Sequence, residues 1–379
     1  MDELRMIGAL LDEPPSERSV ARGRALLEQE IASPRRQARR LVVPRPRLAL
    51  PLVVGAVAAA TAVAVGLASG TAPRGPGEPS GTAAPSSARA VLLAAAEKAE
   101  REPAGRYWRI RTVTDGAVYA VGSGAGSYVV ARSSEAVDWV PRSASDDHVT
   151  YRRSLGVGPA TEADRAAWRR AGSPRTWRVR TADDTRAITL TMSGPGRWET
   201  YRQTAQERRR QCERAGGERC DTEPWVERER MASRPGGLER LLFPWDAERA
   251  ATGGRAPAPD AANRLLAGYE FLTHAASPEL RAAVFRLLAD QPDIRLARGV
   301  RDMRGREGIA LVGRGRTIGG ASGTFDVQLL LEPGTYRVLG RQYVVVTEGG
   351  RFPGVRPGSV VERHAVLDSG WTDESPHLG

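Results

Sequence analysis

Lysine, asparagine, histidine and cysteine are scarce in this sequence. Among 379 residues there are four histidines and two cysteines, and Lys98 and Asn263 are the only lysine and the only asparagine. The net charge of +11 therefore comes from arginine, a pattern typical of a GC-rich genome. The tract RQTAQERRRQCERAGGERC, residues 202–220, mixes both charge signs and has no interleaved aromatic residue. We therefore expect a solvated surface there and no direct nucleic-acid partner.

Catalytic and cofactor motifs are also missing. No G-x-S-x-G occurs, and GRGRTIGG, residues 313–320, lacks the Gly-Lys-Ser/Thr of a P-loop. The histidines are scattered along the chain, and their spacing matches neither a triad nor a metal site. We therefore expect no enzyme, no metal and no cofactor. The four histidines are His148, His274, His364 and His377.

The two cysteines, Cys212 and Cys220, enclose the segment CERAGGERC. Gly216 and Gly217 within it suit a tight turn, so the spacing favours a disulfide if the segment lies in an oxidising compartment. Two free structural thiols are the alternative.

One long apolar run interrupts the charged sequence. From Leu48 to Ala68 no residue is charged, and at 1.5 Å per residue this gives about 31 Å of helix, close to the ~30 Å hydrocarbon core of a bilayer. The segment after the run is nearly neutral, so the positive-inside rule places the N-terminus in the cytoplasm and the C-terminal domain outside the plasma membrane. The charges that precede the run are Arg35, Arg36, Arg39, Arg40, Arg45 and Arg47.

A cleaved signal peptide is the rival interpretation of this run. It normally has a shorter charged region and an apolar core of about 7–15 residues, followed by a small-residue cleavage site. Here 47 residues precede a longer run, and no clear cleavage site follows. We therefore expect a retained transmembrane helix at 48–68 and a flexible linker rich in Pro, Gly and Ser at 69–87.

Residues 1–47 predict a cytoplasmic tail with two short helices. Their apolar faces are too small to enclose a core, so they would dock on the lipid surface or on a cytosolic protein. A solvated, partly ordered tail is the alternative. The candidate partner-binding residues are Leu4, Ile7, Leu10, Leu11, Leu26, Leu27 and Ile31.

Residues 88–379 predict an extracytoplasmic α+β domain, an antiparallel sheet with helices packed on one face. Ser87 can cap one helix, and Ser277 followed by Pro278 can begin a second. Alternation in GRYWRIRTV and in TFDVQLLL indicates half-buried strands. In the second of these strands the residues expected to face the core are Phe325, Val327, Leu329 and Leu331.

The segments SPELRAAVFRLLADQPDIRLARGVRDMRGREGIAL and LEPGTYRVLGRQYVVV carry a family-like pattern. A P-x-L-R-A-A helix precedes a G-x-V-x-D-x-x-G-R-x-G hairpin, and a strand pair follows. With the Arg-rich flank and the Ala/Val run, the chain resembles actinobacterial single-pass membrane proteins of unassigned function. Glu332 and Tyr336 replace the usual Asp and Gly of the pattern. The matching residues are Pro278, Leu280, Arg281, Ala282, Ala283, Gly299, Val300, Asp302, Gly305, Arg306 and Gly308.

This resemblance implies a regulator or envelope sensor, because genes of that family often lie beside extracytoplasmic-function sigma factors. The implied partner is a cytosolic sigma factor bound by the tail. Residues 1–47 hold no His or Cys, so the zinc-binding anti-sigma module is absent from them. The alternative function is a carrier-like module that binds an apolar lipid or peptide ligand on a curved sheet, by fold-level analogy with lipoprotein carriers.

Overall fold

A computed structural model of the chain describes residues 86–122, 126–180, 187–214, 224–244, 260–316, 323–349 and 354–378. All of them belong to one compact unit, Pro79–Gly379. The predicted cytoplasmic tail, the predicted span at 48–68 and nearly all of the predicted linker lie outside the described residues.

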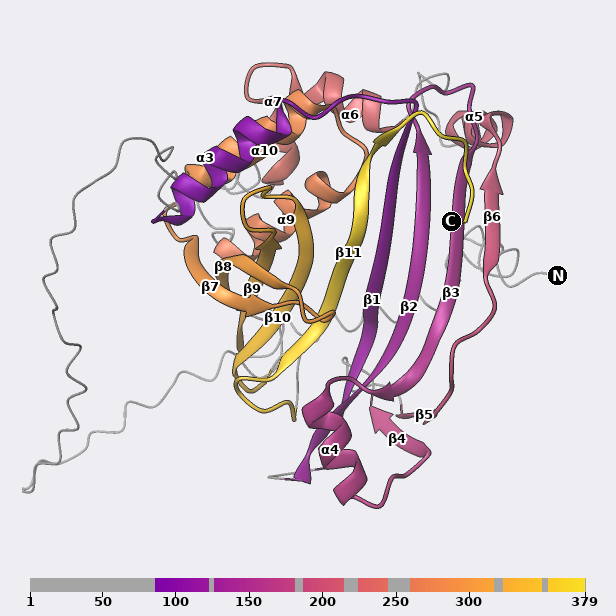
Figure 1. The fold of residues 1–379 in the computed structure, drawn as a ribbon, viewed down its shortest axis with the longest axis vertical. Coiled ribbons are helices and arrows are strands. Elements are labelled where there is room, and N and C mark those ends of the chain that lie inside the picture. The colour runs from indigo at the N-terminus through magenta and orange to yellow at the C-terminus, as the bar shows by residue number, and fades with distance from the viewer. Residues whose placement is uncertain are drawn as a thin grey trace, which may run out of the picture. The chain divides into compact units, whose positions relative to one another are not determined.

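A nine-stranded antiparallel sheet dominates the structure, in the order β6-β3-β2-β1-β11-β10-β9-β8-β7 (Figure 1). Its centre joins the first strand of the chain to the last, since β1 pairs with β11. A small second sheet pairs β4 (Thr176–Arg180) with β5 (Ala187–Thr191). The large sheet contains β1 (Tyr107–Val121), β2 (Tyr128–Pro141), β3 (His148–Pro159), β6 (Glu199–Gln203), β7 (Arg295–Arg301), β8 (Glu307–Arg316), β9 (Thr324–Leu331), β10 (Val338–Thr347) and β11 (Val360–Thr372).

The main helices begin where the sequence supplies caps. Ser87 and Ser277 accept hydrogen bonds from the backbone N–H groups of Ala90 and Leu280, which confirms both predicted helix starts. Asp260 caps a third helix in the same way through Asn263. The described helices are α3 (Ala88–Ala99), α4 (Glu162–Arg170), α5 (Ala205–Arg214), α6 (Pro224–Ala232), α7 (Gly237–Leu242), α9 (Ala261–Thr273) and α10 (Pro278–Ala289).

The face of the sheet on which α9 packs, here called the helix face, holds the main core. The alternation in β9 is confirmed, because Phe325, Val327, Leu329 and Leu331 are all buried in one cluster with α9, α10 and α3. Two glycines of β8 allow the first residues of α9 to pack directly against the strand. A Cβ at Gly313 would lie 2.5 Å from backbone atoms of Ala261, and one at Gly315 would lie 2.7 Å from Ala262 Cβ.

Two tryptophans fix the connection between α9 and α10 to the centre of the sheet. The indole N–H of Trp108 donates to the Thr273 carbonyl at 3.2 Å, and that of Trp371 donates to the Ala276 carbonyl at 3.1 Å. The rings meet edge to face with centroids 5.7 Å apart. The buried Arg281 guanidinium lies 4.4 Å from the Trp108 ring centroid and donates to the Leu272 carbonyl. These contacts set how closely α9 approaches β1 and β11.

The opposite face, here called the tail face, is covered at β1–β3 by the end of the chain, drawn in yellow in Figure 1. The indole of Trp139 donates to the His377 carbonyl at 3.2 Å, and the Tyr151 hydroxyl donates to the Pro376 carbonyl at 3.4 Å. Beneath these contacts, Glu135 accepts hydrogen bonds from the guanidinium groups of Arg111 and Arg153. Burial would raise the pKa of Glu135, but the two arginines outweigh it and the pKa is lowered.

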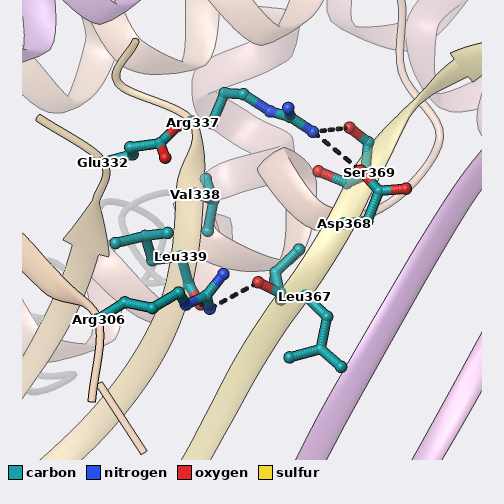
Figure 2. A pocket seen from close by; sticks show the side chains of 9 residues that line it. Arg306, Glu332, Arg337, Val338, Leu339, Leu367, Asp368 and Ser369 are labelled. Carbon is teal, nitrogen blue, oxygen red and sulfur yellow. Dashed lines mark hydrogen bonds and ion pairs between the residues drawn. The ribbon is translucent and has the colours of Figure 1, made fainter. Parts of the chain in front are cut away.

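Backbone pairing between β10 and β11 ends at the pair Gly340 and Ala365, so the two strands separate toward Val338 and Asp368. Guanidinium groups bridge the strands there in place of the backbone ladder, as Figure 2 shows. Arg306 donates to the carbonyls of Leu339 and Val366 at 3.1 and 2.8 Å, and Arg337 donates to the Ser369 carbonyl at 2.6 Å. The space that remains is only about 70 Å³.

The turn between β9 and β10 explains one departure from the family-like pattern. Tyr336 has φ +58°, in the left-handed region that favours glycine, and its backbone N–H donates to the Glu332 carbonyl at 2.9 Å. Gly334, two residues earlier, also has positive φ. The turn therefore forms with tyrosine at a position where the pattern has glycine, at the cost of local strain.

The predicted single-pass membrane fold and plasma-membrane location are contradicted. Within the described ranges no helix has both the length and the apolar character needed to cross a bilayer. The longest of these helices, α9, has 13 residues, or about 20 Å of helix against the ~30 Å required. The α+β class holds only in part, because a large antiparallel sheet with few helices dominates.

Candidate functional site

A cavity of about 400 Å³ lies between α9 and the centre of the helix face. Its floor comes from β1, where Trp108, Ile110, Thr112 and Thr114 point to this face at alternate positions. The wall is the side of α9 that carries Tyr269 and the last turn of the helix. Helix α9 packs chiefly on β8 and β9, and the cavity lies beside these contacts, lined by residues of β1, β2 and β11.

Strand register brings distant polar residues to this floor. Asp138 on β2 lies opposite Ile110, and His364 on β11 lies opposite Thr114. Arg341 on β10 in turn lies opposite His364. Asp138 and Arg341 thus stand at opposite ends of the cavity, separated by two intervening strands.

Three of the four histidines line this one cavity, from three separate elements. His148 begins β3, His274 caps the end of α9 and His364 lies on β11. The described ranges contain no group of three or more His, Cys, Asp or Glu side chains arranged to hold a metal ion.

His364 is neutral at physiological pH, because burial lowers its pKa from 6.5 to about 4. Its Nδ1 is joined by a hydrogen bond to the Tyr269 hydroxyl, and the two rings meet edge to face at 5.5 Å. This pair links α9 to β11 and forms one end of the cavity.

His148 forms the other end, and burial lowers its pKa as well, against the opposing influence of Asp138. Its Nε2 atom is buried and has no hydrogen-bond partner among the described residues. A buried ring nitrogen without a partner is unfavourable by about 1–3 kcal/mol unless a ligand or water satisfies it.

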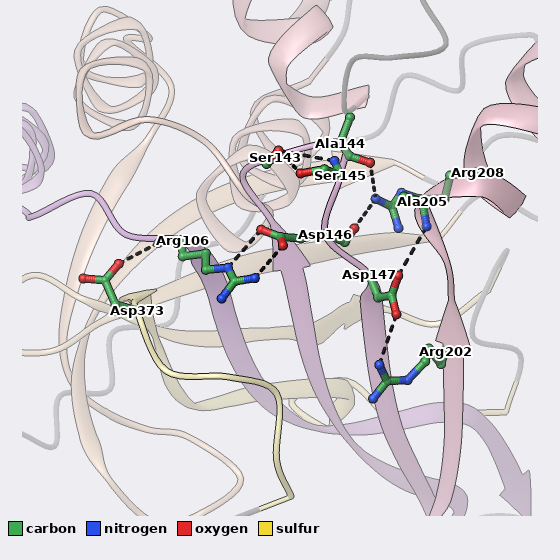
Figure 3. A network of polar contacts seen from close by, with 10 residues as sticks. All are labelled: Arg106, Ser143, Ala144, Ser145, Asp146, Asp147, Arg202, Ala205, Arg208 and Asp373. Carbon is green, nitrogen blue, oxygen red and sulfur yellow. Dashed lines mark hydrogen bonds and ion pairs between the residues drawn. The ribbon is translucent and has the colours of Figure 1, made fainter.

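A polar network just before His148 holds this end in place (Figure 3). Arg106 makes two hydrogen bonds to the Asp146 carboxylate, at 2.6 and 3.0 Å, which raise the pKa of Arg106. Arg208 of α5 donates to the carbonyls of Ala144 and Asp146. Asp147 pairs with Arg202 of β6 at 3.1 Å. The loop that leads into His148 is therefore tied to β1, β6 and α5.

Arg341 differs from most other arginines of the sheet, because no carboxylate of the described residues pairs with it. Its guanidinium lies 5.4 Å from the ring centroids of both Tyr269 and Tyr343. Its Nε is buried without a hydrogen-bond partner in the described part of the chain. By contrast, Arg314 on β8 pairs with Asp326. A stacked cation that faces a cavity and has no carboxylate partner within the described ranges is suited to an anionic group.

The sequence identified none of these residues as a site. Each was visible only as one position on an alternating strand or helix, and no short-range motif joins them. Of the predicted site residues, Cys212 lies on α5, while Cys220 lies outside the described residues, so their pairing stays a prediction. The six flanking arginines and the seven apolar tail residues also lie outside them, and docking on a sigma factor likewise stays a prediction.

No family model, no curated protein and no solved structure matches this chain. The resemblance noted from the sequence stays a prediction.

Proposed function

We propose that the described domain is a ligand-binding module that holds a small amphipathic molecule between α9 and the sheet. The observation that carries the proposal is that one cavity combines apolar surface with buried polar atoms that lack partners among the described residues. Trp108, Ile110 and Val140 supply the apolar surface, while His148 and Arg341 supply the polar atoms. A volume of about 400 Å³ falls within the usual range of ligand pockets.

The surroundings of the cavity favour binding over a purely structural gap. The indole contacts hold α9, which forms the wall of the cavity, and the network before His148 holds the end at His148. A preformed site of this kind loses little conformational entropy when a ligand enters.

An environment-sensitive dye tests the proposal before the natural ligand is identified. Anilinonaphthalene sulfonate combines an apolar ring system with one anionic group, so the native full chain should bind it with a stoichiometry near one. Thr114→Trp should fill the floor of the cavity and weaken binding by about tenfold or more, since the dye and the indole cannot share the space.

Thr189→Trp is the matched control, because Thr189 lies exposed on β5, away from the cavity. It should leave the affinity of the dye unchanged. Equal affinity in the wild type and in a folded Thr114→Trp variant would refute the binding function.

A further inference from the structure

The charges around the cavity are arranged as a dipole. At one end, Asp138 of β2 presents a carboxylate that also accepts a hydrogen bond from the Thr150 hydroxyl. Glu270 of α9 lines the cavity as well, 3.7 Å from His274 Nδ1. At the other end, Arg341 presents a guanidinium that is stacked between two tyrosine rings. Between them lie Trp108, Ile110 and the hydroxyls of Thr112 and Thr114.

We propose that the ligand is a short peptide bound with its carboxylate at Arg341 and its amino group at Asp138. This inference deepens the proposed function and rests on it. A ligand with two opposite charges would satisfy both ends, whereas a fatty acid would place an apolar chain against Asp138.

The separation of the two ends suits a short extended peptide. Asp138 and Arg341 are separated by three strand spacings and four residue steps in the register, or about 20 Å between Cα atoms. Both side chains line the cavity, and an extended peptide of about five residues, at about 3.3 Å each, covers most of this distance.

The polar floor suits a peptide backbone. Thr112, Thr114 and Thr273 place hydroxyls along the cavity, and His148 contributes a buried ring nitrogen without a partner in the described ranges. Amide N–H and C=O groups can pair with these atoms, while an apolar side chain rests on Trp108 and Ile110.

The test uses the full chain and three forms of one pentapeptide, Ala-Leu-Ala-Leu-Ala, measured by titration calorimetry. The forms are the free peptide, the N-acetylated peptide and the C-terminal amide. The free form should bind most tightly, and blocking either end should weaken binding by about tenfold or more, because each block removes one charge-assisted contact.

Variants then assign each end. In Arg341→Gln the amide and the free peptide should bind equally, while acetylation still weakens binding. In Asp138→Asn the acetylated and the free peptide should bind equally, while amidation of the C-terminus still weakens binding. Arg341→Lys, which keeps the charge, should retain part of the preference, and Arg314→Gln, a strand arginine paired outside the cavity, should retain all of it.

Three results would overturn the inference. The first is equal binding of all three peptide forms by the wild type, and the second is an amide effect that persists in Arg341→Gln. The third is the binding of dodecanoate or the dye without binding of any peptide, which would leave the ligand-binding module standing with a single-headed amphiphile. Failure of the dye and the peptides together would overturn the module itself.

Discussion

The helix face has two halves that differ in how they are stabilised. Over β8–β10, helices α9 and α10 bury an apolar surface in which Val327, Leu329 and Leu331 are at most 1% exposed. Over β1–β3 the same face carries Thr114, Asp138 and Thr150, all only half-buried. We call these the covered half and the polar half.

The difference shows what each half contributes. Apolar burial in the covered half fixes the position of α9. The polar half is stabilised from its tail face, by the Glu135 ion pairs and by the aromatic cluster under the end of the chain. The cavity forms at the border of the two halves, where Trp108 packs against the α9–α10 connection while Thr114 and Asp138 line the open space.

Truncation in the covered half should produce the largest effect. Leu288 of α10 is 0% exposed, and Leu288→Ala should reduce the free energy of unfolding by about 2–5 kcal/mol. Leu287→Ala is the matched control, because Leu287 is only half-buried at the edge of the same cluster and should cost less. Urea unfolding measures both. Equal losses would mean that the covered half is less tightly packed than described.

The second largest loss of stability is expected from removing the charge of Glu135, which lies on the tail face of the polar half. The Glu135 side chain is 5% exposed and pairs with two arginines, so Glu135→Gln should destabilise by roughly 2–4 kcal/mol at pH 7. Its folded pKa is lowered from 4.5. Its contribution is therefore complete above that value and is lost as pH falls through the folded pKa. Unfolding of both proteins at several pH values should show the difference shrinking in acid.

The predicted disulfide would add stability beside the polar half. Cys212 lies on α5, which contacts the loop between β2 and β3 through Arg208. Closing the segment to Cys220 should restrict the unfolded chain by about 2–3 kcal/mol in the loop-entropy model. Mass mapping of unreduced protein should find one linked peptide. Alkylation of both cysteines without reductant would reject the pairing.

A smaller effect is expected from His364 at the border. Its folded pKa of about 4 lies below the unfolded value of 6.5, so the unfolded state binds more protons between these values. Stability should therefore fall as pH falls from 6.5 to 4, by on the order of 1–3 kcal/mol. His364→Gln should remove this component, whereas His377→Gln on the tail face should retain it. Melting temperatures of the wild type and both variants between pH 4 and 6.5 measure this component.

Local patterns in the sequence predicted part of this structure. Ser87 and Ser277 begin helices as expected, and the alternation in TFDVQLLL marks the core side of β9. The predicted single-pass membrane class is contradicted, because no helix within the described ranges could cross a bilayer. The cavity was not predicted from the sequence. Its residues come from several strands and a helix, and no recognisable motif joins them.

The sequence by itself determined the caps, the alternation and the position of hairpin turns, because these depend on residues a few positions apart. Only the tertiary structure decided the strand order, the pairing of β1 with β11 and the place of α9 over Gly313. Those features depend on register and on close packing between segments far apart in the chain. For the same reason only the tertiary structure brought three scattered histidines and Arg341 to one cavity.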